Sequence, residues 1–164
     1  MSDALSDLGE IYDTHAPRVF RYIYHRLGDR ALAEDLTSEV FVRYLHARTT
    51  PDTLIAFLYR IAHNLVVDYL RRNPPAQSIG DHVLVDQADP AHLAELEMER
   101  AQLRRAIVRL TPDQQQVIVL KFLEGLSNEE IARVLDKPLG AVKALQHRGL
   151  VALRDLLSAQ AQRE

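Results

Sequence analysis

The sequence contains no cysteine and no tryptophan, and aromatic residues make up only 6% of its 164 residues. Without cysteine the chain has no disulfide and no thiolate metal site, which is typical of a reducing compartment. Few aromatics and glycines, with many Leu, Ala and Arg residues, favour helices over a β-sandwich. No apolar run is long enough to span a membrane, and the acidic N-terminus lacks the features of a signal peptide. We therefore expect an all-α, cytoplasmic protein.

Cationic residues are missing from one stretch, residues 73–99, which has a net charge of −6. Residues 1–72 have a net charge of −1 and residues 100–164 one of +4, within a total of −3. A basic segment beside an acidic one is typical of a DNA-contacting module on an acidic tether, although two ordinary domains also show such asymmetry.

The same acidic stretch is poor in helical periodicity. Asn73–Pro90 holds three of the seven prolines and three aspartates, a composition typical of a linker. We therefore predict two small helical domains, residues 1–72 and 92–164, joined by a linker at residues 73–91.

Apolar spacing predicts helices throughout both domains. The expected helices are Leu5–Tyr12, Val19–Leu27, Ala31–Ala47, Leu54–Arg72, Ala91–Arg109, a helix from the Thr111 cap to Gly125, and a final hairpin over Leu126–Leu157. We expect Pro17 to begin or kink the second of these helices. Leu45 and Phe122 are expected on buried helix faces.

One face of the expected helix Ala31–Ala47 is acidic. Asp35, Glu39 and Val42, followed by His46, are spaced four, three and four residues apart and so line up along the helix. An acidic row that includes an apolar residue suits a partner surface that is basic and partly apolar. A solvated face without a partner is the alternative.

A cationic stripe follows the expected helix Leu54–Arg72 at three- and four-residue spacing. Its members are Arg60, His63, Asn64, Val67 and Arg71, with Arg72 beside it and Tyr59 and Tyr69 nearby. Charges for phosphates and rings for bases are typical of proteins that contact single-stranded DNA or the DNA backbone. This stripe is a candidate nucleic-acid surface.

The stretch Leu126–Leu157 has the pattern of two helices joined by a tight turn. Ser127 and Glu130 form a capping box at the start, and Pro138 and Gly140 interrupt the helical run. A longer cationic helix then follows from Ala141. This plan is typical of a helix-turn-helix whose second helix enters the major groove, although an ordinary helical hairpin has a similar pattern.

Catalytic motifs are not found. The sequence has no glycine-rich phosphate loop, no G-x-S-x-G and no H-E-x-x-H, and no two of its seven histidines are three or four residues apart. We therefore expect no enzyme activity, no cofactor and no metal site.

Three segments resemble a known family. Arg26–Ala47 and Phe57–Arg72 are similar to conserved region 2 of bacterial σ70-family sigma factors, and Leu110–Leu157 is similar to their region 4 helix-turn-helix. With both regions in this order, the chain resembles the small extracytoplasmic-function (ECF) sigma factors. The resemblance implies a factor that binds core RNA polymerase and directs promoter recognition, −10 melting and transcription initiation.

The resemblance also implies roles for particular residues and a set of partners. The residues implied for core polymerase binding are Asp35, Ser38, Glu39 and Val42; for −10 DNA, Leu54, Phe57, Arg60, His63, Asn64, Arg71 and Arg72; and for −35 DNA, Ser127, Lys143, Ala144, His147 and Arg148. A flipped −10 base would be taken by the loop Thr49–Ile55. The implied partners are the β′ clamp and β flap of the polymerase, promoter DNA and an anti-sigma factor.

Several positions depart from the family pattern. Phe57 replaces a usual Trp, and Ser38 replaces a usual Gln. Where the family commonly has S-x-G-T-V-K-S-R-L, this chain has PLGAVKALQ from Pro138 to Gln146, so a Ser, a Thr, a second Ser and an Arg are lost. The preferred −35 sequence must then differ from the commonest one or depend more on shape and phosphates. Nothing in the sequence explains Gln146 on the apolar side.

Two other functions remain open from the residues alone. A stand-alone helix-turn-helix transcriptional regulator shares the C-terminal features but leaves the cationic stripe and the acidic face unexplained. A small helical enzyme needs a catalytic constellation that the sequence does not contain.

Overall fold

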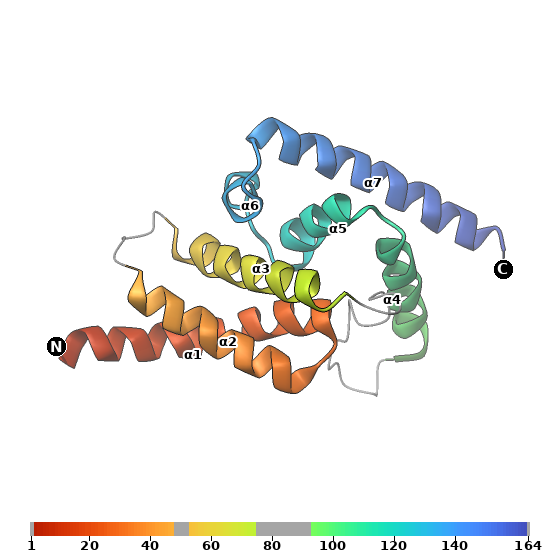
Figure 1. Cartoon of the computed structure of the whole chain (residues 1–164). Helices are drawn as coiled ribbons and strands as arrows, with labels where there is room; N and C mark the ends of the chain where they lie inside the picture. Colours follow the sequence, from red (N-terminus) through yellow and green to blue (C-terminus); the bar gives the residue numbers. More distant parts are fainter. Residues whose placement is uncertain (1, 48–52, 75–92, 164) are drawn as a thin grey trace.

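The computed structural model describes residues 2–47, 53–74 and 93–163, and all regular structure in these ranges is helical. The elements are α1 (Ser2–Leu27), α2 (Arg30–His46), α3 (Leu54–Arg72), α4 (Leu93–Val108), α5 (Pro112–Ile118), a short π-helix η3 (Val119–Leu123), α6 (Asn128–Leu135) and α7 (Leu139–Ala161). In Figure 1 α1, α2 and α3 lie together as one bundle, and α4 to α7 form the other half of the molecule. The all-helical prediction is confirmed for the described residues. Most of the predicted linker lies outside them.

The N-terminal helix is continuous, which corrects the two-helix prediction. Pro17 lies inside α1 and is solvent-exposed, while Ala16, Val19 and Ile23 on the other face are buried. Because these apolar residues all pack into the same core, the helix continues through the proline despite its missing N–H. Gly28, with φ of 70°, ends the helix.

Helix α2 begins where the sequence predicts, but its buried face is only partly the expected one. Asp29 caps it by accepting a 3.1 Å hydrogen bond from the N–H of Leu32. The buried residues are Ala33, Thr37, Val40 and Phe41. Leu45, expected in the core, is 55% exposed, because the helix axis is placed by its contacts with α1 and α3 rather than by its own sequence.

The C-terminal half uses both predicted capping boxes. The Thr111 hydroxyl accepts from the Gln114 N–H at 3.3 Å, and the Ser127 hydroxyl accepts from the Glu130 N–H at 3.1 Å. The expected burial of Phe122 is wrong, because this side chain is 52% exposed.

The cause lies in the π-helix η3. The Glu124 N–H donates to the Val119 carbonyl at 3.0 Å, five residues back, so the end of the helix is rotated relative to a regular α-helix. Phe122 then faces outward, and Glu124 is buried.

The turn before α7 also differs in detail from the expectation. Asp136 adopts the left-handed conformation with φ of 53°, whereas Gly140 lies within α7. Helix α7 begins at Leu139, two residues earlier than predicted, because Pro138 serves as its N-cap. Further along, Gly149 allows close packing on α5: a Cβ there would lie 3.0 Å from the Cγ1 of Ile118.

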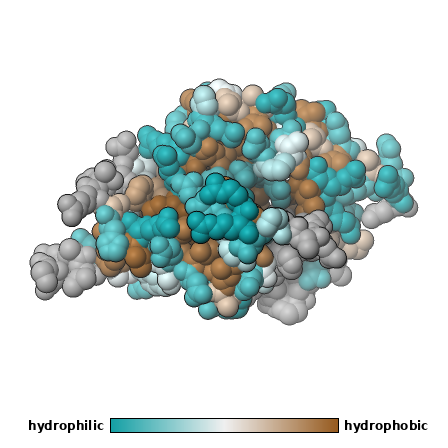
Figure 2. All heavy atoms as spheres, in the orientation of Figure 1, coloured by the Kyte–Doolittle hydropathy of each residue, from teal (hydrophilic) through white to brown (hydrophobic). Residues whose placement is uncertain are grey.

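The two halves share part of their buried core. One buried cluster joins α1, α2 and α3 to Val117, Leu120, Leu126, Ile131, Val134 and Val142 of the C-terminal half. A second cluster, which includes Ile107, Leu110 and Leu153, lies within the C-terminal half alone. Helix α6 packs directly on α3. On the face shown in Figure 2, hydrophilic residues cover much of the surface and hydrophobic residues lie between them.

Candidate nucleic-acid interface

Most of the predicted cationic stripe is a continuous exposed surface on α3. Arg60, Asn64, Val67 and Arg71 are all exposed, and Arg72 is exposed beside them. Arg60 has no hydrogen bond or ion pair with any residue in the described ranges, and Arg71 pairs only with Asp68 at 2.7 Å. An exposed pair of this kind contributes little to stability, so its arginine remains available to a phosphate.

His63 is the exception within the stripe, because it faces the C-terminal half. Its Nδ1 accepts a hydrogen bond from Arg26 at 3.1 Å, and the side chain is half-buried. Burial first, and then the charge of Arg26, lower the pKa of His63 from 6.5 to about 4. The imidazole is therefore neutral at pH 7.

The aromatic residues near the stripe are less available than the sequence indicated. Tyr59 has no exposed surface, so the expectation that its ring stacks on a base is wrong for this arrangement. Phe57 is half-buried and makes an edge-to-face contact with Tyr44, with ring centroids 6.1 Å apart. Leu54, at the first position of α3, is also half-buried. Residues 49–52 of the loop Thr49–Ile55, which is expected to take a flipped base, lie outside the described ranges.

The acidic face of α2 is accessible. Asp35, Ser38 and Val42 are exposed, and the partly exposed Glu39 pairs with Arg43 at 3.0 Å. Leu45, which the sequence interpretation placed in the core, adds apolar surface three residues after Val42. The three-residue spacing from Val42 indicates this exposed face, although Leu45 also fits the expected buried stripe.

The helix-turn-helix presents its second helix to solvent. Lys143, Ala144, His147 and Arg148 are exposed on the first half of α7. The Ser127 hydroxyl accepts the capping hydrogen bond from the Glu130 N–H, and the side chain is half-buried. Gln146 is half-buried beside Val142, and the contacts of the structure give no reason for an amide at this position.

The two halves are joined by polar contacts as well as by the apolar cluster. We call this surface the interdomain seam and define it by Arg18, Thr53, Tyr59, Glu124 and Arg133. The hydroxyl of Tyr59 donates to the Glu124 carboxylate at 2.5 Å, and Arg18 donates to the Glu124 carbonyl at 2.8 Å. Arg133 of α6 donates to the hydroxyl of Thr53 at 2.9 Å.

Glu124 is the centre of the interdomain seam. It is only 4% exposed, and the nearest cation to its carboxylate is Arg21, at 3.9 Å. Burial and the adjacent Glu124 carboxylate raise the pKa of Tyr59 above its usual value of 10, so the hydroxyl remains a donor at neutral pH. Sequence reasoning did not identify this contact, which joins residues 65 positions apart.

Within the described residues, no group of three or more His, Asp or Glu side chains is arranged to hold a metal ion. In the same part of the chain, every helix is too short or too polar to cross a bilayer.

Comparisons with known proteins agree with this arrangement. Residues 11–74 match the family described as Sigma-70 region 2, and residues 100–153 match Sigma-70, region 4. The ECF RNA polymerase sigma factor BldN of Streptomyces coelicolor is 38% identical over 91% of this chain and 60% of its own length. SigW of Bacillus subtilis, also an ECF RNA polymerase sigma factor, is 32% identical over 94% of this chain and 89% of its own length. The chain thus spans less than two thirds of BldN.

Solved structures show the same fold. The sigma factor RpoE of Bartonella quintana, in complex with the anti-sigma factor NepR, aligns with a TM-score of 0.70 and 21% identity, covering 93% of this chain and 97% of that one. CnrH, in complex with the cytosolic domain of CnrY, aligns with a TM-score of 0.66 and 24% identity, covering 93% and 88%. The two matched regions, together with relatives that align over most of this chain, show that it belongs to the ECF type of the sigma-70 family of RNA polymerase sigma factors.

Proposed function

We propose that this protein is the promoter-specificity subunit of RNA polymerase, which binds core enzyme and directs −10 melting and transcription initiation. One observation carries the proposal: α3 and α7, in the two matched regions, each present exposed cations to solvent. Two such surfaces on one chain suit a factor that engages DNA at two places. The polymerase supplies the catalysis, and this chain supplies the recognition.

The exposed surfaces support the following division of roles. Asp35, Ser38, Glu39 and Val42 on α2 dock on the β′ clamp, and the exposed Leu45 extends the apolar part of that contact. Arg60, Asn64, Arg71 and Arg72 on α3 contact −10 DNA, while Leu54, Phe57 and His63 lie at the edges of this surface. Lys143, Ala144, His147 and Arg148 on α7 face the −35 major groove, and Ser127 holds the start of α6.

The packed arrangement does not reach both promoter elements. Elements centred near −10 and −35 are about 25 base pairs apart, or about 85 Å at about 3.4 Å per base pair. Helix α7, with 23 residues, is only about 35 Å long, and it follows α6, which packs on α3. The interdomain seam must therefore open before the protein engages a whole promoter.

Partners follow from the same proposal. Core polymerase contacts the protein through the β′ clamp and the β flap, and an anti-sigma factor controls it in the cytoplasm. The support for an anti-sigma factor is that RpoE and CnrH, which share the fold, were each solved with a protein partner, NepR or CnrY.

Reconstituted transcription tests the proposed function. Core polymerase and this protein, with no other sigma factor, should initiate from a promoter selected out of genomic fragments. Glu39→Arg should abolish initiation without unfolding the protein, because Glu39 lies on the docking face and makes only an exposed ion pair. A stand-alone regulator, the alternative, would instead bind duplex DNA by itself and yield transcripts only with a second sigma factor.

A further inference from the structure

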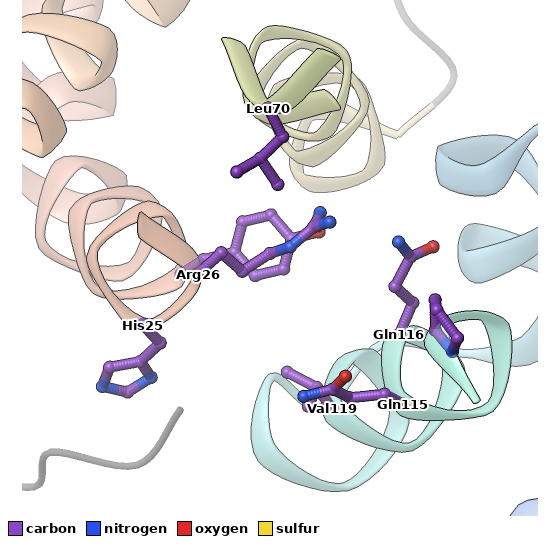
Figure 3. Close-up of a pocket in the computed structure, with 8 residues that line it drawn as sticks. His25, Arg26, Leu70, Gln115, Gln116 and Val119 are labelled. Atoms are coloured by element: carbon purple, nitrogen blue, oxygen red, sulfur yellow. The ribbon is translucent and has the colours of Figure 1, made fainter. Parts of the chain in front are cut away.

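A cavity of about 290 Å³ lies between the two halves, where α1 and the end of α3 face α5 (Figure 3). Leu70, Pro112 and Val119 contribute apolar surface, and the polar groups come from Tyr22, His25, Arg26, Gln115 and Gln116. Pockets for small organic ligands begin at about 300 Å³ and are mostly apolar with a few polar groups. By size and composition the cavity is of the kind that holds a small ligand.

Arg26 gives this cavity a positive charge. In Figure 3 its side chain extends from α1 toward Gln116 of α5. Its hydrogen-bond partners are the Tyr22 hydroxyl at 3.3 Å and the Nδ1 of His63 at 3.1 Å. Neither partner is a carboxylate, the His63 imidazole is neutral at pH 7, and Arg26 forms no ion pair with any side chain in the described ranges.

Arg26 still has hydrogen-bonding capacity in this position. A guanidinium carries five N–H donors in a fork that matches a carboxylate, and the two contacts above use only its Nη1. The unused donors are on Nε and Nη2, which can together face one carboxylate.

We propose that this cavity binds a small amphiphilic carboxylate, such as an arylalkanoate or a short fatty acid. The carboxylate pairs with the Arg26 guanidinium, and the apolar body lies against Leu70, Pro112 and Val119. Charge-assisted bidentate pairs of this kind are among the strongest hydrogen-bonded contacts in proteins.

The position of the site gives the ligand an effect on conformation. Its walls come from α1 and α3 on one side and from α5 and the start of η3 on the other. A ligand that contacts both halves binds only the packed arrangement and therefore favours it over the open one. If the proposed function is correct, such a ligand opposes promoter engagement and acts as a negative effector.

Calorimetry on the full-length protein tests the site without any transcription assay, so its failure is distinct from failure of the proposed function. The probes are phenylacetate, 4-phenylbutyrate and octanoate, with 4-phenylbutanol as the uncharged control. At least one carboxylate should bind with a dissociation constant below about 1 mM, and the alcohol should bind about tenfold more weakly or worse. No binding by any of the three acids, or equal binding of the alcohol, overturns the proposal.

Variants on both halves locate the ligand. Arg26→Gln should weaken binding about tenfold or more, Arg26→Lys should retain part of it, and the exposed Arg30→Gln should leave it unchanged. On α5, Gln116→Trp fills the cavity and should block binding, with the folded state checked by thermal unfolding. If Gln116→Trp binds the probe as the native protein does, the ligand does not lie between the halves and the proposal is wrong.

Discussion

The hydrogen bond from Tyr59 to Glu124 is the most direct test of how the two halves are held together. Tyr59→Phe removes one hydroxyl and keeps the buried ring. In the packed arrangement the Glu124 carboxylate, 4% exposed, then loses its 2.5 Å donor and keeps only the more distant Arg21, at 3.9 Å. In the open arrangement water hydrates the Glu124 carboxylate, so the substitution removes no hydrogen bond from it in that state. The substitution therefore destabilises the packed state selectively.

The expected magnitude follows from the chemistry of the contact. A hydrogen bond to a charged group contributes about 1.5–3 kcal/mol, so about 2 kcal/mol is a reasonable cost for its loss. That cost shifts the equilibrium between packed and open states roughly 30-fold toward the open state. If only the open state binds core polymerase productively, the apparent affinity rises as its population rises. A variant that is less stable should then bind polymerase more tightly.

Two measurements on the same variant check this reasoning. Because the native chain has no cysteine, spin labels at Glu10→Cys and Ser158→Cys, one in each half, report the distance between the halves without interference. Tyr59→Phe should broaden that distance distribution toward longer values and lower the dissociation constant for core polymerase. Tyr22→Phe is the matched control, since among the described residues its hydroxyl forms a hydrogen bond only with Arg26, on the same helix. If Tyr59→Phe binds polymerase more weakly than the native protein, or if both variants behave alike, the seam does not control access.

Four further outcomes are expected. Glu39→Arg should reduce co-purification with core polymerase with an unchanged melting temperature, whereas undiminished recovery would exclude the docking face. Arg148→Ala should weaken −35 binding by about 1–3 kcal/mol if it contacts a base, measured on specific and scrambled duplexes; equal losses on both would assign it to a phosphate. Gly149→Leu should cost about 1–3 kcal/mol in chemical denaturation, because even a Cβ would lie 3.0 Å from Ile118. Burial and Arg26 lower the pKa of His63 to about 4, so the unfolded state binds more protons between pH 4 and 6.5. The free energy of unfolding should rise by about 2.5 kcal/mol across that window, and His63→Gln should remove this rise.

Local chemistry accounts for the parts of the fold that the sequence predicted well. The two capping boxes at Thr111 and Ser127 each depend on residues three positions apart, so both partners are visible in one short stretch. Helix α3 has the predicted bounds, Leu54–Arg72, because turn-forming residues precede it and a polar, proline-rich stretch follows it. The exposed faces of α3 and α7 follow from the same helical periodicity.

Packing between helices decides the details that the sequence did not predict. Leu45 and Phe122 are apolar and lie at helical spacing from core residues, yet both are exposed. The first depends on how α2 is rotated against α1 and α3, and the second on a π-helix that no single residue type specifies. Tyr59, expected near DNA, is buried because α3 has partners on two sides, α1 and α2 on one and α6 on the other.

Glu124 shows why the interdomain seam was the hardest feature to predict. A glutamate directly before Gly125 fits a solvated helix end, and its partners, Tyr59 and Arg18, are 65 and 106 positions away. The one local signal is its place at the end of the apolar stretch that begins at Val117, where an acid is costly unless it is paired. The Glu124 carboxylate accepts the hydrogen bond from Tyr59 when the halves pack and is hydrated when they separate, so it favours the packed state by only about 2 kcal/mol. That balance suits the proposed function, in which the two halves pack together in this structure and the proposed DNA surfaces lie about 85 Å apart on a promoter.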